Sequence, residues 1–127
     1  MSLGTTIFSL LNNNTDCGSN VFPMERPQET LLPALTYGII STIPVKQKTT
    51  TADLQQIRVQ ISIYSNSYAQ IETIASQVRS QLDVGGMYNE NNIQTTTFDG
   101  ERDDYIQNAG YDGIFAKYQD YIMFVER

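Results

Sequence analysis

The sequence predicts one α+β domain with about four strands and two helices. At 127 residues the chain has room for one hydrophobic core, and no internal repeat or change of composition divides it. Ile57 to Tyr64 alternates apolar and polar residues, which is typical of a strand with one buried face. Ile71 to Leu82 repeats apolar residues at helical spacing directly afterwards. Strand and helix patterns therefore follow one another within a single domain, residues 1–127.

The first helix is predicted from about Thr5 to Asn13. Apolar residues recur there at helical spacing, and the turn-forming run "NNNTDCGSN" ends the pattern. The next stretch, "VFPMERPQETLLPALTYG", contains three of the four prolines and is predicted to be extended and irregular, since proline fixes φ and removes a donor.

A long hairpin is predicted in the middle of the chain. Leu35 to Ile43 is rich in β-branched and aromatic residues and forms the first long strand. Pro44 to Leu54 is polar without a regular period, which indicates a long connection. The alternating strand that starts at Ile57 then pairs with Leu35–Ile43 as an antiparallel ribbon whose connection projects beyond the sheet.

The second helix is predicted to have about 15 residues and to lie across the sheet. Ser67 and Gln70 have the S-x-x-Q form of a capping box. Gly85 and Gly86 follow as stop residues. The predicted buried stripe consists of Ile71, Ile74, Ala75, Val78 and Leu82.

Two further strands are predicted near the C-terminus. Ile93 to Phe98 is a short strand, and Asp99 to Asp112 reads as an acidic loop with five acids and one base. The last run, "FAKYQDYIMFVER", is apolar on both faces. It is therefore predicted as an inner strand, or as an edge strand that another subunit covers.

Neither a metal site nor a catalytic site is expected. An EF-hand register starting at Asp99 would place Asp104 and Gly110 where glycine and glutamate are required. The chain has no histidine, so Cys17 has no Cys-His partner, and a structural thiol is the favoured interpretation. Phosphate-loop, nucleophile-elbow and C-x-x-C motifs are absent. We expect no enzyme activity and no cofactor.

Charge and hydropathy argue against nucleic-acid and membrane partners. Fourteen acids against eight bases give a net charge of −6, which is unfavourable for binding phosphate backbones. The apolar runs are far shorter than the roughly 20 residues that span a bilayer. The start of the chain lacks the basic region of a signal peptide, so folding in the cytoplasm is expected.

Two groups of residues are candidates for partner contact. Lys46 and Lys48 lie in the polar connection, which is either a solvated hairpin tip or an arm that orders on a partner. Tyrosines are concentrated toward the C-terminus. Two interpretations fit this: they belong to a protein interface, or they lie on exposed strand faces. The full set of contact candidates is Val45, Lys46, Gln47, Lys48, Thr49, Thr50, Thr51, Tyr105, Tyr111 and Tyr121.

The order of the segments resembles the tail-completion proteins of long-tailed bacteriophages and prophages, which are relatives of the tail terminator. The resemblance runs from about Leu3 to Val125 and rests on "VFP" after a short helix, on "LLPALTYG", and on "IRVQISIYSNSYAQIETIASQVRSQLD". It implies two helices packed on one face of a mainly antiparallel sheet. It also implies a structural protein of the virion that forms a ring, with six subunits expected, between the tail tube protein and the head connector or stopper protein. Val45–Thr51 would be the contact arm, and Asp99–Asp112 a second contact surface or a face that repels wrong partners.

Two alternatives remain open at this point. A small bacterial α+β module that binds a ligand or peptide would require an apolar cleft with convergent polar groups. An enzyme that uses the carboxylates of the acidic segment would require their pKa values to lie well above the ordinary ones.

Overall fold

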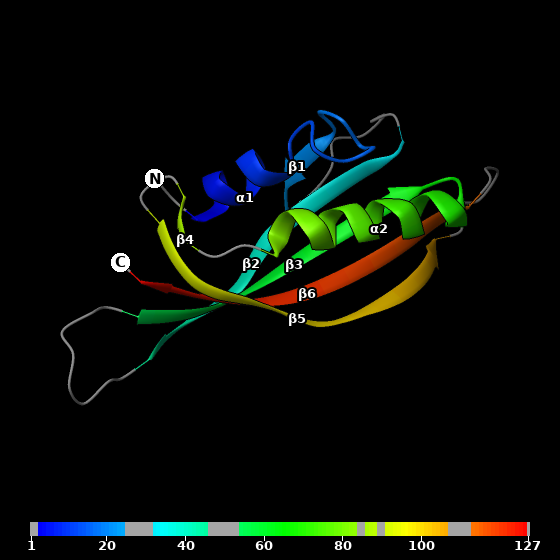
Figure 1. The fold of residues 1–127 in the computed structure, drawn as a ribbon. Helices are drawn as coiled ribbons and strands as arrows, with labels where there is room; N and C mark the ends of the chain where they lie inside the picture. The colour runs from blue at the N-terminus through cyan, green and yellow to red at the C-terminus, as the bar shows by residue number, and fades with distance from the viewer. Residues whose placement is uncertain are drawn as a thin grey trace.

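A computed structural model describes residues 3–24, 32–45, 54–83, 86–88, 91–106 and 113–126. In these residues six strands form one sheet with the order β1-β2-β3-β6-β5-β4. The long strands are β2 (Ala34–Val45), β3 (Leu54–Ser65), β5 (Asn91–Ile106) and β6 (Ile114–Glu126), and the short ones are β1 (Val21–Pro23) and β4 (Gly86–Tyr88). Helices α1 (Leu3–Leu11) and α2 (Tyr68–Leu82) lie on the same face of the sheet (Figure 1).

The predicted α+β class and the mainly antiparallel sheet are confirmed. All strand pairs are antiparallel except β1 with β2, which is parallel. The predicted number of about four strands was too low. The two missed strands, β1 and β4, have three residues each. Such short strands depend on a long neighbour for their hydrogen bonds and leave little pattern in the sequence.

The predicted hairpin of two long strands is confirmed. β2 and β3 pair antiparallel from Ala34↔Tyr64 to Val45↔Leu54. Both strands are longer than predicted, because polar residues next to the connection, such as Gln55 and Gln56, also join the ladder. The connection itself, residues 46–53, lies outside the described residues.

Helix α2 has the predicted length and buried stripe, but its cap differs from the predicted capping box. The Ser67 hydroxyl accepts a hydrogen bond from the Gln70 backbone N–H at 3.4 Å, as predicted. The Gln70 side chain instead accepts a hydrogen bond from the Ser65 hydroxyl. Ser65 Oγ in turn accepts from the Ser67 N–H at 3.1 Å. Ser65, the last residue of β3, therefore accepts the Ser67 N–H in place of the Gln70 side chain, which fixes the turn between β3 and α2.

At the other end of α2, Gly86 belongs to β4 rather than to a cap, and Gly85 lies outside the described residues. Asp83 is the C-cap residue, and its N–H donates to the Arg79 carbonyl. Helix α1 starts and ends two residues earlier than predicted. Its end is followed by Asn13, which has a positive φ of 59° that asparagine tolerates better than most residues.

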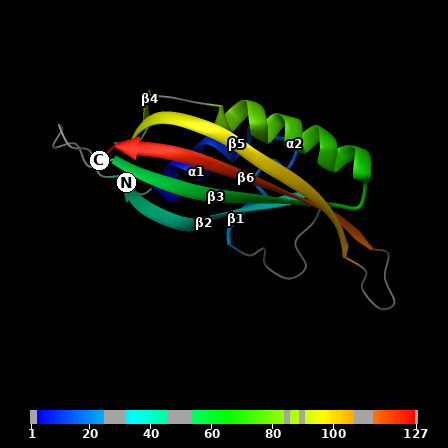
Figure 2. The same ribbon diagram turned by 90° about the horizontal axis from the view of Figure 1, so that it is seen from below.

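The core lies between the two helices and the sheet. α2 packs over β3 and β6, and α1 packs beside it over β1 and β2. The aliphatic centre consists of Ile7, Leu11, Leu35, Val59, Ile61, Ile63, Ile71, Ile74, Val78 and Leu82, all fully buried. Cys17 is buried in this core as well. The opposite face of the sheet has no described helix over it (Figure 2).

The acidic segment is the largest departure from the predicted secondary structure. Asp99 to Ile106 is the second half of β5, paired with β6 from Gly100↔Asp120 to Ile106↔Ile114, and not a loop. Only residues 107–112 of the predicted loop lie outside the described residues. β6 is an inner strand between β3 and β5, as one of the two predicted arrangements required.

Candidate assembly surfaces

Three of the predicted contact residues, Val45, Tyr105 and Tyr121, belong to the described part of the chain, and their environments differ. Val45 is the last residue of β2, while Lys46 to Thr51 and Tyr111 lie outside the described residues. Tyr105 is 52% exposed near the end of β5, where its ring packs on Phe115 with 5.0 Å between centroids. It remains available to a partner.

Tyr121 does not fit its predicted role as a surface contact. It is 1% exposed, and its hydroxyl donates to Gln119 Oε1 at 2.9 Å. Its ring meets Phe98 edge to face at 5.5 Å. Burial raises its pKa well above the ordinary value. The strand pattern placed Tyr121 on the same face as Met123 and Val125, and that face is the core.

The acids of β5 are paired within the chain on both faces of the sheet. On the face of the sheet that has no described helix over it, Asp99 forms an ion pair with Arg58 at 2.7 Å. On the helix face, Asp103 and Glu101 contact the Lys117 ammonium at 2.7 and 3.7 Å. These carboxylates therefore tie β5 to β6 through Lys117 and to β3 through Arg58, which explains why a charge-rich segment forms a strand.

Lys117 is the centre of a polar cluster between β5, β6 and the start of α2. Its side chain is only 7% exposed, and the Tyr68 hydroxyl donates to the same carboxylate, Asp103, at 2.6 Å. The Lys117 and Tyr68 hydrogen bonds lower the pKa of Asp103. Burial lowers the pKa of Lys117, but the hydrogen bond to Asp103 and the neighbouring acids outweigh it, so that this pKa is raised. Both groups are held in their charged forms. This is the behaviour of a structural ion pair, and a general acid or base would need the opposite shifts.

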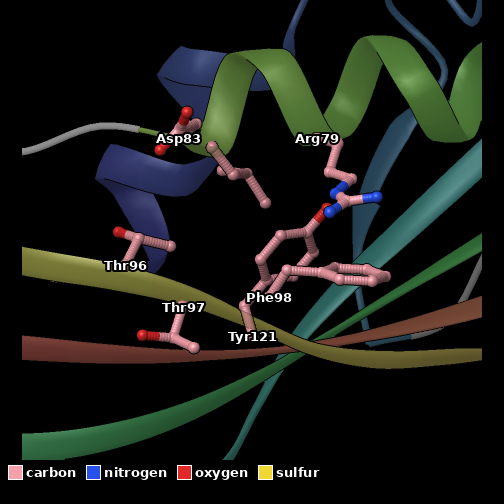
Figure 3. A pocket seen from close by; sticks show the side chains of 7 residues that line it. Arg79, Asp83, Thr96, Thr97, Phe98 and Tyr121 are labelled. Atoms are coloured by element: carbon pink, nitrogen blue, oxygen red, sulfur yellow. The ribbon is translucent and has the colours of Figure 1, made fainter.

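A cavity of about 390 Å³ lies between the end of α2 and β5 (Figure 3). The guanidinium of Arg79 stacks over the Phe98 ring at 4.0 Å, and Tyr121 also lines the cavity. A smaller cavity of about 230 Å³ continues past Arg79 toward Lys117 and Gln119. The Gln119 amide is itself satisfied by the Ala75 carbonyl and Glu101. The Tyr121 hydroxyl and the Gln119 amide are therefore already hydrogen-bonded within the chain.

The described residues show no group of three or more potential ligands that could hold a metal ion. Burial raises the pKa of the Cys17 thiol to about 11, which keeps it protonated and unreactive at neutral pH. Neither helix among the described residues has the length and apolar character of a membrane span.

The most exposed apolar strand segment was not identified from the sequence. β1 covers the outer edge of β2 only at Leu35–Tyr37, and no described strand pairs with that edge from Gly38 to Val45. Ile39, Ile40 and Ile43 in this segment are 39%, 53% and 52% exposed. The signal was present as two adjacent isoleucines that break the alternation of the strand. The outer edge of β5 is the second free edge, because β4 pairs with Asn91–Ile93 and no other described strand pairs with that edge.

Comparisons with known proteins agree with the resemblance inferred from the sequence. A search of curated proteins by sequence gave no match. A solved structure titled "Virion of native gene transfer agent (GTA) particle" contains a chain with the same fold. Its TM-score is 0.70 at 14% identity, over 99% of this chain and 96% of that one. The family model described as tail completion protein gp17 matches residues 7–121. Because this match spans nearly the whole chain, the protein belongs to the tail completion protein gp17 family.

Proposed function

We propose that this protein is a non-enzymatic structural component of a phage or prophage virion that closes the head-proximal end of the tail tube. It would form a ring, with six subunits expected, between the tail tube protein and the head connector or stopper protein. It would be made in the cytoplasm of the bacterial host. Membership of the tail completion family carries the proposal. The shared fold with a chain of a gene transfer agent virion supports it.

The surfaces of the chain suit a ring subunit. A ring of identical copies requires two different, complementary patches on each copy. The free edges of β2 and β5 lie on opposite sides of the sheet. The β2 edge carries three exposed isoleucines, which are costly to leave in water and are typical of a covered surface.

The contact arm Val45–Thr51 remains part of the proposal. Its first residue, Val45, ends β2, whose outer edge is unpaired among the described strands, and residues 46–51 remain a prediction from the sequence. Tyr105, exposed on β5, is the second retained candidate, and Tyr111 remains a prediction from the sequence. Tyr121 is withdrawn because it belongs to the core.

A ligand-binding module is a second candidate, favoured by the cavity of about 390 Å³ beside Arg79. Its size falls within the usual range for small-molecule sites. Two of its polar lining residues are already engaged within the chain, since Arg79 is stacked on Phe98 and the Tyr121 hydroxyl donates to Gln119. We therefore rank this function second.

Deletion of the gene from the phage or prophage that encodes it tests the proposed function. Without a joint, heads and tails should accumulate separately, and infectious particles should be lost. Supplying the wild-type gene in trans should restore joined particles, while supplying the Ile74→Asp variant, which disrupts the core, should not. Normal joined and infectious particles after deletion would refute the proposal.

A further inference from the structure

The two free edges of the sheet have geometries that match each other. β2 is antiparallel to β3, β3 to β6, and β6 to β5, so β2 and β5 run in opposite directions within one copy. If two copies stand side by side in the same orientation, β5 of one copy lies antiparallel to β2 of the next. The alternation of strand directions then continues across the contact.

The unpaired segments of β2 and β5 also occupy the same rows of the sheet. Following the register across β3 and β6, Gly38 shares a row with Gly100, and Ile43 shares a row with Thr95. β1 covers β2 only before Gly38, and β4 covers β5 only before Gln94. Each edge therefore has an unpaired window of six residues, about 20 Å long, in the same rows of the sheet. The two windows face each other when the copies stand side by side with no shift along the strands.

β2 and β5 each have one extra residue in the same interval of the sheet, so the two edges stay in register when they pair. Between the row of Gly38 and the row of Ser41, β3 and β6 have one residue each, whereas β2 has two, because Ile40 is an extra residue in a bulge. β5 also has two residues in the same interval, because it has an extra residue between Phe98 and Gly100. Direct pairing of Gly38–Ile43 with Thr95–Gly100 consequently matches residue for residue, with Ser41 opposite Thr97.

Charge favours this pairing over contact between two β5 edges. β2 has no charged residue, whereas Asp99–Asp104 of β5 has four acids and one arginine. Two β5 edges side by side would bring these acidic strands together, which is unfavourable. In the window itself Asp99 is the single charged residue, and Arg58 already neutralises it at 2.7 Å. The uncharged, isoleucine-bearing β2 edge can approach it without like-charge repulsion.

We propose that a second copy of this chain occupies the free edge of β2 by adding its β5 strand, with Gly38–Ile43 of one copy antiparallel to Thr95–Gly100 of the next. This inference rests on the proposed ring and states how it closes. The contact is heterologous, so repetition leads to a closed ring or a filament and not to a two-fold dimer. Ile40 and Ile43 would lose their exposure to water at this junction.

Cross-linking in assembled particles tests the pairing. Ser41→Cys and Thr97→Cys are introduced together in a Cys17→Ser background, and particles are treated with a short bis-maleimide. Within one copy these two positions are three strand spacings apart, about 14 Å, so a shorter linker joins only different copies. We expect a ladder of covalent multimers up to the size of the ring. Each single variant should give no multimer, and Ser41→Cys with Ser80→Cys, a pair that includes the solvated face of α2, is the matched control.

A second variant set measures the energy of the contact. Ile40→Asp with Ile43→Asp places charges on the β2 edge at exposed positions that leave the core untouched. For purified protein, light scattering should show half-assembly at a concentration at least about tenfold higher than for the wild type. Ser80→Asp, an exposed helix position, should have no such effect.

The outcomes separate this inference from the proposed function. Particles that contain the protein at the head-tail joint but give no ladder, or a ring unaffected by the Asp variants, would overturn the strand pairing and leave the function intact. Covalent dimers from Ser41→Cys alone would show β2 against β2 and also overturn it. Particles that lack the protein altogether would overturn the proposed function, and the pairing with it.

Discussion

Removing the two partners of the Lys117–Asp103 pair should have unequal effects on stability. Lys117 is 7% exposed and Asp103 is 43% exposed, with 2.7 Å between their charged atoms. Asp103→Asn leaves an ammonium nearly buried, with Glu101 at 3.7 Å as its nearest remaining acid. A hydrogen bond between charged groups contributes about 1.5 to 3 kcal/mol. Solvent screening at Asp103 reduces this, so we expect a loss of about 1 kcal/mol in the free energy of unfolding.

Lys117→Met removes the buried charge itself and fills the same space with apolar atoms. Asp103 is then free to be hydrated, because almost half of its side chain faces water. We expect this variant to unfold within about 0.5 kcal/mol of the wild type, or to be more stable. Urea denaturation at pH 7 measures both differences. A loss for Lys117→Met as large as that for Asp103→Asn would refute the reasoning.

The same pair predicts a dependence on pH. The pKa of Asp103 is lower in the folded protein than its ordinary value of 3.8. The unfolded chain therefore binds the proton more readily, and the contribution of Asp103 is present above pH 3.8 and lost as the pH falls through the lower folded pKa. The difference between wild type and Asp103→Asn should accordingly shrink in acid. Lys117, whose folded pKa is raised, keeps its contribution until the pH exceeds its ordinary value of 10.5.

Three further predictions concern the core, the helix cap and the thiol. Ile74→Ala, at a fully buried position, should cost about 2 to 5 kcal/mol in urea denaturation, whereas Ile43→Ala, half exposed, should change the stability of the monomer by less than about 0.5 kcal/mol. Ser67→Ala should cost about 1 kcal/mol by the same assay, because the Gln70 N–H loses its acceptor. A thiol reagent at pH 8 should label Cys17 slowly in the folded protein and rapidly in urea, since burial raises its pKa to about 11. Equal rates would contradict the buried placement.

The parts of the fold that sequence could predict are those in which a single periodic pattern decides the structure. β3 alternates cleanly and α2 carries one apolar stripe, so the position and buried residues of both, and the length of α2, were predicted. β5 was misread after Phe98 because its acids have low strand propensity. Lys117 on the adjacent strand β6 and Arg58 on β3, one strand further, supply the opposite charges, and those partners are distant in sequence. In this segment, ion pairs with distant residues outweighed the low strand propensity of the acids.

The candidate surfaces were harder to predict than the fold. Tyr121 and Tyr105 have the same residue type, yet one is 1% and the other 52% exposed. The difference depends on which strand face the helices cover, and composition does not reveal it. The exposed isoleucines of β2 were read as ordinary strand residues, because a free edge exists only once the order of strands is known.

The position of the protein in the particle tests the proposed function most directly. Cryo-electron microscopy of particles from the encoding phage or prophage would resolve the junction between tail tube and head. We expect density for a ring of subunits with this sheet and its two helices between the last layer of the tube and the connector. A junction without this fold, with the protein found at the distal end of the tail or in no particle, would contradict it.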